Sequence, residues 1–156
     1  MRKEFVDLLH EEMSKNNKIF VLTGDIGYGI LDKIRDSFPT RFKNVGCSEQ
    51  LMIGMAIGLY YEGYTTICYS ITPFVLYRPF EMIRNYINNE NIPIKLVGTG
   101  RNKEYLHLGF THWAEDDTDI LTPFTNIIKF KPLTLNKSVI IDFLYNNAPS
   151  YLNISR

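Results

Sequence analysis

Short apolar runs alternate with stretches of helical periodicity along this chain, and the alternation limits the folds open to it. The first run, KIFVLTGD, is continuously apolar up to Gly24 and Asp25, which is typical of a strand buried on both faces of a parallel sheet. Before it, residues 2–16 place their apolar side chains on one helical face. Repeated alternation of this kind predicts an α/β fold with a mainly parallel sheet and helices on both faces.

The same alternation continues to the end of the chain. Further strands are expected in residues 42–46, 64–71, 92–100, 125–130 and 150–155. Further helices are expected in residues 30–38, 48–61, 77–88, 113–121 and 134–146, with a long loop over 101–111. Ligands of such sheets bind beyond the carboxyl ends of the strands, so we expect a site in the loops after Gly24, Val45, Ser70 and Val97.

Composition excludes several classes of protein. The 156 residues, 45% of them hydrophobic, suit one domain with a core, and the formal net charge of zero gives no attraction to nucleic acid or to an anionic membrane. The longest apolar run, residues 51–61, is about half as long as a bilayer span. No signal peptide is expected in the charged residues 1–12, so we expect a cytoplasmic protein. The two cysteines form no disulfide or metal framework, and Cys47 is expected to be a buried thiol.

One acid, Glu49, stands at the start of the apolar helical segment SEQLMIGMAIGLYY. An acid in the first turn of a helix interacts favourably with the helix dipole, by about 0.3–1 kcal/mol. A capping box is excluded because Gly46 stands three positions earlier, where Ser or Thr is needed. Glu49 is therefore either a helix-end charge or an acid in a pocket with a partner. Gly54 and Gly58 give the same helix a smooth strip that another backbone can approach closely.

Four segments carry a family resemblance. GDIG, NVGCSEQLMIGMAIGLYYEG, SITPFVLYRPFEMIRN and LGFTHWAEDD resemble, in order and spacing, the pyrimidine-binding domain of transketolase-like thiamine diphosphate enzymes, above all of transketolases split into separate subunits. The resemblance covers about residues 2–156, and E-Q-x-M-x-G-x-A-x-G-L is its most specific part. It implies the thiamine diphosphate-binding fold. It also implies transfer of a two-carbon ketol unit from a ketose or 2-oxo donor to an aldehyde acceptor.

The resemblance implies that Glu49 activates thiamine diphosphate. The cofactor reacts at C2 after its own 4′-amino group removes the C2 proton, and that group becomes basic only when N1′ of the aminopyrimidine ring is protonated or strongly hydrogen-bonded. A glutamate in an apolar pocket has a raised pKa because of desolvation, which favours sharing a proton with N1′ near neutral pH. Leu51, Met52 and Ile53 would form this pocket, with Met52 at the cofactor.

The resemblance places three more residues at the cofactor. Phe74 and Tyr77 would form the wall on which the aminopyrimidine stacks, and ordinary packing of a helix face is the alternative for both. Asp25 matches an acidic position near the cofactor, and a turn residue is its alternative.

Three residues are assigned to the substrate by the same resemblance. His112 would face the thiazolium ring and the sugar, where it could hydrogen-bond a substrate hydroxyl and shuttle a proton; its alternative is a cap at the start of the helix around residues 115–117. Arg2 and Arg156 match positions that hold the phosphate end of an acceptor sugar, for which guanidinium is suited, although both lie at chain termini. No spacing fits a metal site, so no metal ligand is expected in this chain.

Three departures from the family pattern point to a partner. Leu108 replaces an acid of typical transketolases and the upstream loop lacks the family's extra histidine, which leaves acceptor specificity open. The G-D-G motif and later Asn that bind Mg²⁺ and the diphosphate are missing, and the chain stops at Arg156, where relatives continue into a C-terminal domain.

We therefore expect residues 1–156 to be a single pyrimidine-binding domain that shares its cofactor with a separate diphosphate-binding subunit in an α2β2 assembly, with Mg²⁺ on that partner. The partner is expected to pack on the Gly54 and Gly58 strip. Alternatives are a β-type subunit of a 2-oxoacid dehydrogenase, a deoxyxylulose-phosphate-type synthase, or a non-catalytic scaffold with the same fold.

Overall fold

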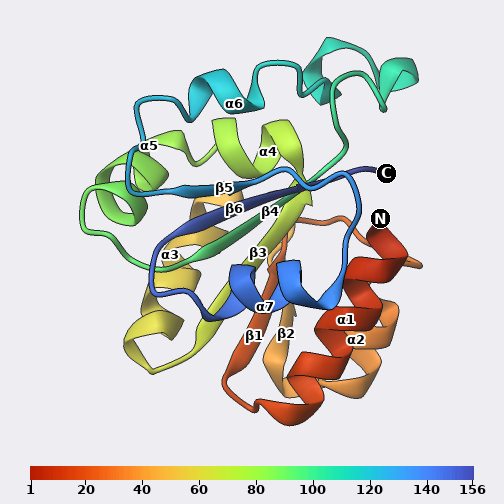
Figure 1. The fold of residues 1–156 in the computed structure, drawn as a ribbon, viewed down its shortest axis with the longest axis vertical. Coiled ribbons are helices and arrows are strands. Elements are labelled where there is room, and N and C mark those ends of the chain that lie inside the picture. Colours follow the sequence, from red (N-terminus) through yellow and green to blue (C-terminus); the bar gives the residue numbers. More distant parts are fainter.

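Six parallel strands form the central sheet of the computed structural model, which describes residues 1–156 (Figure 1). Their order across the sheet is β2-β1-β3-β4-β6-β5, and every neighbouring pair is parallel. The strands are β1 (Ile19–Thr23), β2 (Phe42–Asn44), β3 (Thr65–Ile71), β4 (Lys95–Thr99), β5 (Ile128–Phe130) and β6 (Ser150–Ile154). The predicted α/β class and parallel sheet are confirmed.

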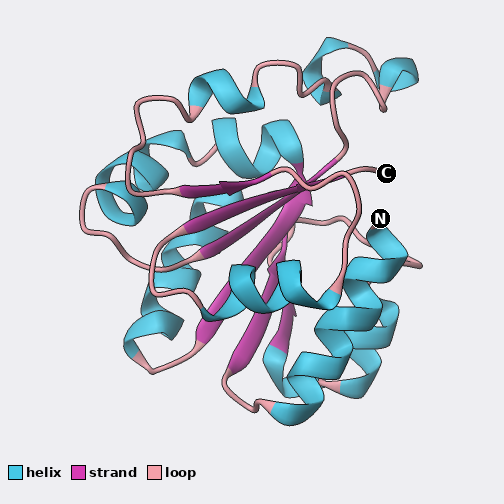
Figure 2. Ribbon diagram, viewed as in Figure 1, coloured by secondary structure: helices cyan, strands magenta, loops and turns pink.

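Helices cover both faces of this sheet, as Figure 2 shows. One face carries α1 (Arg2–Lys15), α2 (Asp32–Ser37) and α7 (Lys137–Tyr145). The other carries α3 (Glu49–Tyr61), α4 (Thr72–Tyr77), α5 (Phe80–Met82), a π-helical turn (Ile83–Asn88) and α6 (Asp117–Ile120). Short 3-10 turns lie at Pro39–Arg41, Leu106–Leu108 and Phe110–His112. None of the helices has the length and apolar character needed to cross a membrane.

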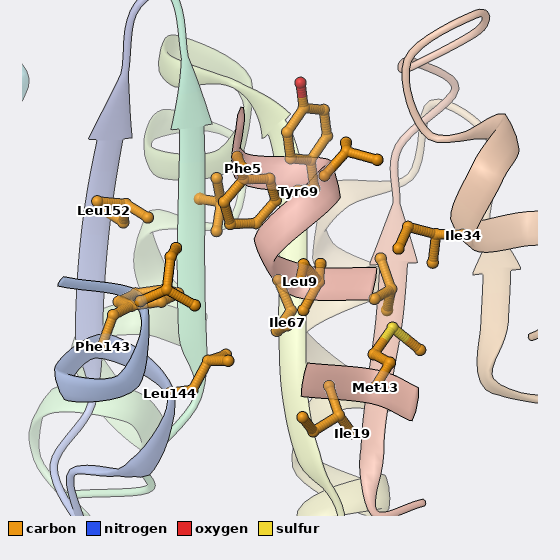
Figure 3. Close-up of a cluster of buried hydrophobic side chains, with 14 of the residues drawn as sticks. Phe5, Leu9, Met13, Ile19, Ile34, Ile67, Tyr69, Phe143, Leu144 and Leu152 are labelled. Atoms are coloured by element: carbon orange, nitrogen blue, oxygen red, sulfur yellow. The ribbon is translucent and has the colours of Figure 1, made fainter. Parts of the chain in front are cut away.

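Neighbouring side chains along each strand point to opposite faces, so the sheet separates two apolar cores. In β1 and β3, Val21 and Ile67 lie side by side in the core under α1, α2 and α7. Leu22 and Cys68, one position further along, lie in the core under α3 and α4. The helix residues labelled in the first core are Phe5, Leu9, Met13, Ile34, Phe143 and Leu144 (Figure 3).

One predicted helix is confirmed only in part. The helix expected over 77–88 is found over residues 80–88 as α5 and the π-helical turn, whereas the sequence pattern did not predict α4, which precedes it over Thr72–Tyr77. Pro73 starts α4 because its fixed φ suits the first helical turn. Pro79 ends the regular hydrogen bonding because it has no N–H to donate. This break leaves Arg78 at the junction of two helices, where the site lies.

Thr72, the first residue of α4, is tied to the carboxyl edge of the sheet by a buried polar network. Its hydroxyl donates to the carbonyl of Gly100 at 2.8 Å, and the amide of Asn153 donates to Thr72 Oγ1 at 3.2 Å and to the Tyr151 hydroxyl at 3.0 Å. The network leaves no room for a side chain at Gly98, because a Cβ there would lie 2.7 Å from Thr72 Oγ1 and 3.0 Å from Tyr151. The start of α4 and the end of β4 are thus held as one unit.

We predict that Gly98→Ala lowers the free energy of unfolding by about 1–3 kcal/mol, because the added methyl group pushes apart fully buried neighbours. Denaturant unfolding followed by circular dichroism measures the change. The matched control is Gly58→Ala in α3, where an added Cβ meets open space and removal of a helical glycine should stabilise the chain by about 0.5–1 kcal/mol. Equal stability of Gly98→Ala and wild type would contradict the prediction.

Candidate functional site

The carboxyl ends of β1 and β3 form the switch point of the sheet. From β1 the chain passes to β2 on one side, and from β3 it passes to β4 on the other. Parallel α/β sheets bind ligands in the crevice at such a point. The start of α3, the residues of α4 and the loop after β4 all lie around this edge.

The carboxylate of Glu49 is buried at this edge. Only 2% of the side chain is exposed, and Oε1 accepts a hydrogen bond of 2.7 Å from Nη1 of Arg78. Gly24, just beyond β1, makes room for it, since a Cβ there would lie 3.2 Å from Oε1. A buried carboxylate needs such a partner because desolvation of an unpaired charge is costly. Glu49 is therefore not the solvated helix-end charge of the first alternative.

The apolar pocket expected from Leu51, Met52 and Ile53 does not describe all the surroundings of Glu49, because a guanidinium faces the carboxylate. Arg78 is 44% exposed and forms one rim of a hollow of about 530 Å³ above the carboxylate. The residues lining this hollow are Cys47, Ser48, Glu49, Gln50, Leu51 and Arg78. The expected buried thiol is wrong, since Cys47 is exposed. No local pattern could have revealed Arg78, which is 29 residues from Glu49 in the sequence.

Phe74 and His112 extend this site away from Glu49. The Arg78 guanidinium lies over the Phe74 ring, with Cζ 3.7 Å from the ring centroid. The His112 ring meets the same Phe74 at 4.9 Å between centroids and an angle of 66°. Four residues from three elements thus form one continuous series of contacts from α3 to the loop after β4.

The loop position of His112 excludes its alternative role as a cap. Its Nδ1 lies 3.0 Å from the hydroxyl of Thr111. The helix α6 begins only at Asp117, and no side chain caps it. Two aromatic rings lie next to that of His112: Phe74, described above, and Tyr105, whose centroid lies 6.4 Å away. His112 therefore lies at the end of the site that is formed by Phe74.

Of the predicted cofactor residues, only Glu49 lines the hollow above it; Phe74, Asp25, Tyr77 and Met52 lie outside its lining. The hydroxyl of Tyr77 donates to Asp116, and its ring lines a separate hollow beside Phe110 and Trp113. Burial, and then Asp116, raise the pKa of Tyr77 well above its ordinary value. Met52 is fully buried in the core beneath α3. Neither side chain lines the hollow above Glu49.

Asp25 occupies a tight turn at the rim of the site. Its φ is +53°, in the left-handed region, and its backbone N–H donates to the Asn44 side chain at 2.9 Å. The hydroxyl of Tyr28 donates to its carboxylate at 2.7 Å, and the Cys47 thiol lies 3.8 Å from the other oxygen. Tyr28 and then Asn44 lower the pKa of Asp25, so this exposed side chain is ionised. These contacts are those of a turn residue.

The two terminal arginines differ in their surroundings. The backbone N–H of Arg156 donates to Glu104, and its guanidinium lies 5.2 Å from the ring centroid of Tyr105. Tyr105 in turn neighbours His112, so Arg156 lies on the His112 side of the site. Arg2 is half-buried at the first residue of α1 and makes no side-chain hydrogen bond or ion pair.

The loop that carries His112 is anchored by Arg101, a residue that the sequence pattern did not single out. Its Nε donates to Asn153 Oδ1 at 2.8 Å, and its Nη2 donates to the carbonyls of Asn153 and Pro132 at 2.6 and 2.7 Å. An isolated β-bridge between Asn102 and Ala114 closes the loop above this anchor. The half-buried fork of hydrogen bonds from Arg101 thus helps to set the position of His112.

A third hollow, of about 270 Å³, lies at the opposite end of the sheet and contains Lys95. The ammonium of Lys95 donates to the carbonyls of Asn146 and Ala148 and to the Asn146 side chain, at 2.7–3.0 Å. Burial lowers the pKa of Lys95 to about 8. Its donors are all used to hold the chain after α7, so this hollow offers a ligand no free cation.

We predict that Arg101→Lys frees the His112 loop without unfolding the sheet, because lysine cannot bridge Asn153 and Pro132 with a planar fork. Loss of two or three hydrogen bonds should cost about 1–3 kcal/mol. Hydrogen exchange should accelerate in residues 102–114 and stay unchanged in β1 and β3. Arg35→Lys, at an exposed position of α2, is the control. Unchanged loop exchange would show that Arg101 is not the anchor.

Comparison with known proteins places these features in a family. The model described as "Transketolase, pyrimidine binding domain" matches residues 1–138. One subunit of the apulose-4-phosphate transketolase of Actinobacillus succinogenes is 33% identical over 119 residues, which are 75% of this chain and 38% of that protein. A putative transketolase C-terminal section of Methanocaldococcus jannaschii is 30% identical over 159 residues, which span 100% of this chain and 50% of that protein. The chain thus spans half or less of the length of these relatives.

Solved structures agree on the fold. A split-gene transketolase, described as an inactive β4 tetramer, superposes with a TM-score of 0.84 at 26% identity and covers 99% of this chain and 51% of that one. The transketolase of Campylobacter jejuni superposes with a TM-score of 0.81 over 98% of this chain and 25% of that one. Its identity is 15%, so that likeness concerns the fold alone.

Proposed function

The chain belongs to the transketolase pyrimidine-binding domain family, and from this membership we propose that it supplies the pyrimidine half of a thiamine diphosphate-dependent transketolase. The enzyme transfers a two-carbon ketol unit from a ketose or 2-oxo donor to an aldehyde acceptor. The observation that carries this proposal is the Glu49 carboxylate, buried at the switch point of the sheet with a flat N–H donor against it.

The residues present fit the aminopyrimidine ring of thiamine diphosphate. Such a ring needs a buried acceptor for N1′ and an aromatic face to stack on. Glu49 is the buried acceptor, and Phe74 presents a face that already holds a planar cation. When bound, thiamine diphosphate supplies the carbon nucleophile of the reaction.

The position of each residue in the site then suggests its role. Glu49 holds the proton at N1′, and Phe74 orients the ring. His112, on the far side of Phe74, is placed to hydrogen-bond a substrate hydroxyl and to exchange a proton with it. Arg156, which lies next to Tyr105 on the His112 side, is our first candidate for binding the phosphate end of a sugar. Arg2 is the second candidate. Asp25 lies at the rim as an ionised acid.

We assign the diphosphate and Mg²⁺ to a separate subunit. The chain has no G-D-G motif, and nowhere do three His, Cys, Asp or Glu side chains gather as a metal site requires. An exposed apolar stripe along α3 offers a surface for that partner: Leu51 is 55% exposed, Tyr61 is 69% exposed, and Gly58 faces open space between them. An α2β2 assembly in the cytoplasm, with the cofactor between chains, fits these features.

The central test is reconstitution with the diphosphate-binding subunit, followed by a ketol-transfer assay. Glu49→Gln should lower kcat by about 10²–10⁴-fold, because the amide cannot hold the N1′ proton. Glu62→Gln, an exposed acid just beyond α3, is the control and should keep wild-type activity. Full activity of Glu49→Gln would refute the proposal, and cleavage of pyruvate in place of ketose phosphates would favour the synthase or dehydrogenase alternatives.

We further predict opposite effects of Gly58→Ala on the free chain and on the assembly. The free chain should gain about 0.5–1 kcal/mol of stability, because alanine is the better helix former and the site is open. Affinity for the partner should fall at least about tenfold, the effect of overpacking by roughly 1–3 kcal/mol at a close backbone contact. Analytical ultracentrifugation of the mixed subunits measures this. Undiminished affinity would place the interface elsewhere.

A further inference from the structure

The guanidinium of Arg78 makes the two contacts that the proposed function assigns to the cofactor ring. Nη1 donates to Glu49 Oε1 at 2.7 Å, and Cζ lies 3.7 Å from the Phe74 ring centroid. We propose that Arg78 is a removable plug of the cofactor site, which occupies the place of the aminopyrimidine in the free chain and leaves when the ring enters. This inference rests on the proposed function.

The geometry requires displacement because both groups need the same space. A guanidinium is a planar cation with N–H donors and stacks on aromatic faces, as an N1′-protonated aminopyrimidine also does. A separation of 3.7 Å is van der Waals contact, so no ring fits between Arg78 and Phe74. The cofactor can therefore stack on Phe74 only after the Arg78 side chain has left that face.

Arg78 is the mobile member of the pair with Glu49. Its side chain is 44% exposed, whereas that of Glu49 is 2% exposed. The single hydrogen bond to Oε1 is the only one that the Arg78 side chain makes. It also lies at the junction of α4 and α5, before Pro79, where regular helical packing is interrupted. Arg78 can therefore rotate into solvent and keep its charge hydrated, but Glu49 cannot leave its place.

The plug explains how a buried carboxylate survives before the cofactor arrives. A buried carboxylate left without a partner destabilises a fold strongly. Arg78 neutralises Glu49 in the free chain, and the incoming ring then takes over that contact. The same exchange weakens binding, because the apparent affinity falls with the fraction of molecules in which the site is open. Arg78 thus stabilises the unassembled chain and at the same time weakens cofactor binding.

Arg78→Ala, with Arg84→Ala as matched control, tests the plug. Arg84 lies in the π-helical turn that follows and is exposed, and its side chain donates a hydrogen bond only to the neighbouring Asn85. In the free chain, Arg78→Ala should lower the melting temperature by about 5–15 °C. This loss should vanish in the Glu49→Gln background, because an amide needs no counter-charge. Arg84→Ala should leave the melting temperature within about 2 °C of wild type.

Binding of thiamine diphosphate to the reconstituted complex is the second measurement, by isothermal titration calorimetry. Arg78→Ala should bind about tenfold tighter than wild type, as expected if the site is open in roughly one molecule in ten. Arg84→Ala should bind like wild type. Should Arg78→Ala fail to fold, Arg78→Lys keeps the charge near Glu49 but loses the flat stack on Phe74, and it should also bind more tightly than wild type.

The outcomes separate the two proposals. If wild type binds the cofactor and Glu49→Gln loses activity, but removal of the Arg78 side chain leaves binding equal or weaker, then the plug is wrong and the proposed function stands. If wild type and all variants bind no thiamine diphosphate, both are wrong. Additive effects of Arg78→Ala and Glu49→Gln on the melting temperature would also overturn the plug, because they would show that the two side chains do not interact.

Discussion

A carboxylate removed from water needs a counter-charge or a shared proton, and this requirement organises the carboxyl edge of the sheet. Glu49 can be buried there because Gly24 has no side chain and because α3 begins at that residue. The N-terminus of a helix also favours a negative charge. Arg78 supplies the remaining compensation from a different element. The chain's own residues thus compensate the buried charge of Glu49 without a ligand.

The surroundings of Glu49 combine a rigid base with a movable rim. The strands below it are buried on both faces, and the start of α4 is fixed by the network of Thr72, Asn153 and Gly100. The side chain of Arg78, by contrast, is partly solvated and held by one hydrogen bond. A binding site that must exchange one flat cation for another gains from this combination, because the frame stays preorganised while only one side chain moves.

Under the proposed function, the chain supplies only part of a transketolase site. Its fold and the position of Glu49 agree with membership of the family, whereas the apolar stripe along α3 stays uncovered. Leu108, which replaces an acid of typical transketolases, is 46% exposed on the loop that carries His112. Under the proposed function, the acceptor side of the site would therefore differ in chemistry from that of typical transketolases, while the cofactor side keeps its glutamate and aromatic face.

Local apolar periodicity in the sequence was enough to predict the strands and most of the helices, and a motif contained within one helix was enough to single out Glu49 as a candidate site residue. The sequence could not place Arg78 on Glu49, Tyr77 on Asp116, or Arg101 on Asn153, which are 29, 39 and 52 residues apart. Such contacts arise only when a parallel sheet brings the ends of distant strands to one edge. The sequence pattern also missed α4, since Pro73 and Pro79 both lie in the segment and only packing decides which one starts a helix and which one ends it. The tertiary structure thus decided which charge neutralises the buried acid, because that partner is chosen by proximity in space and leaves no local pattern in the chain.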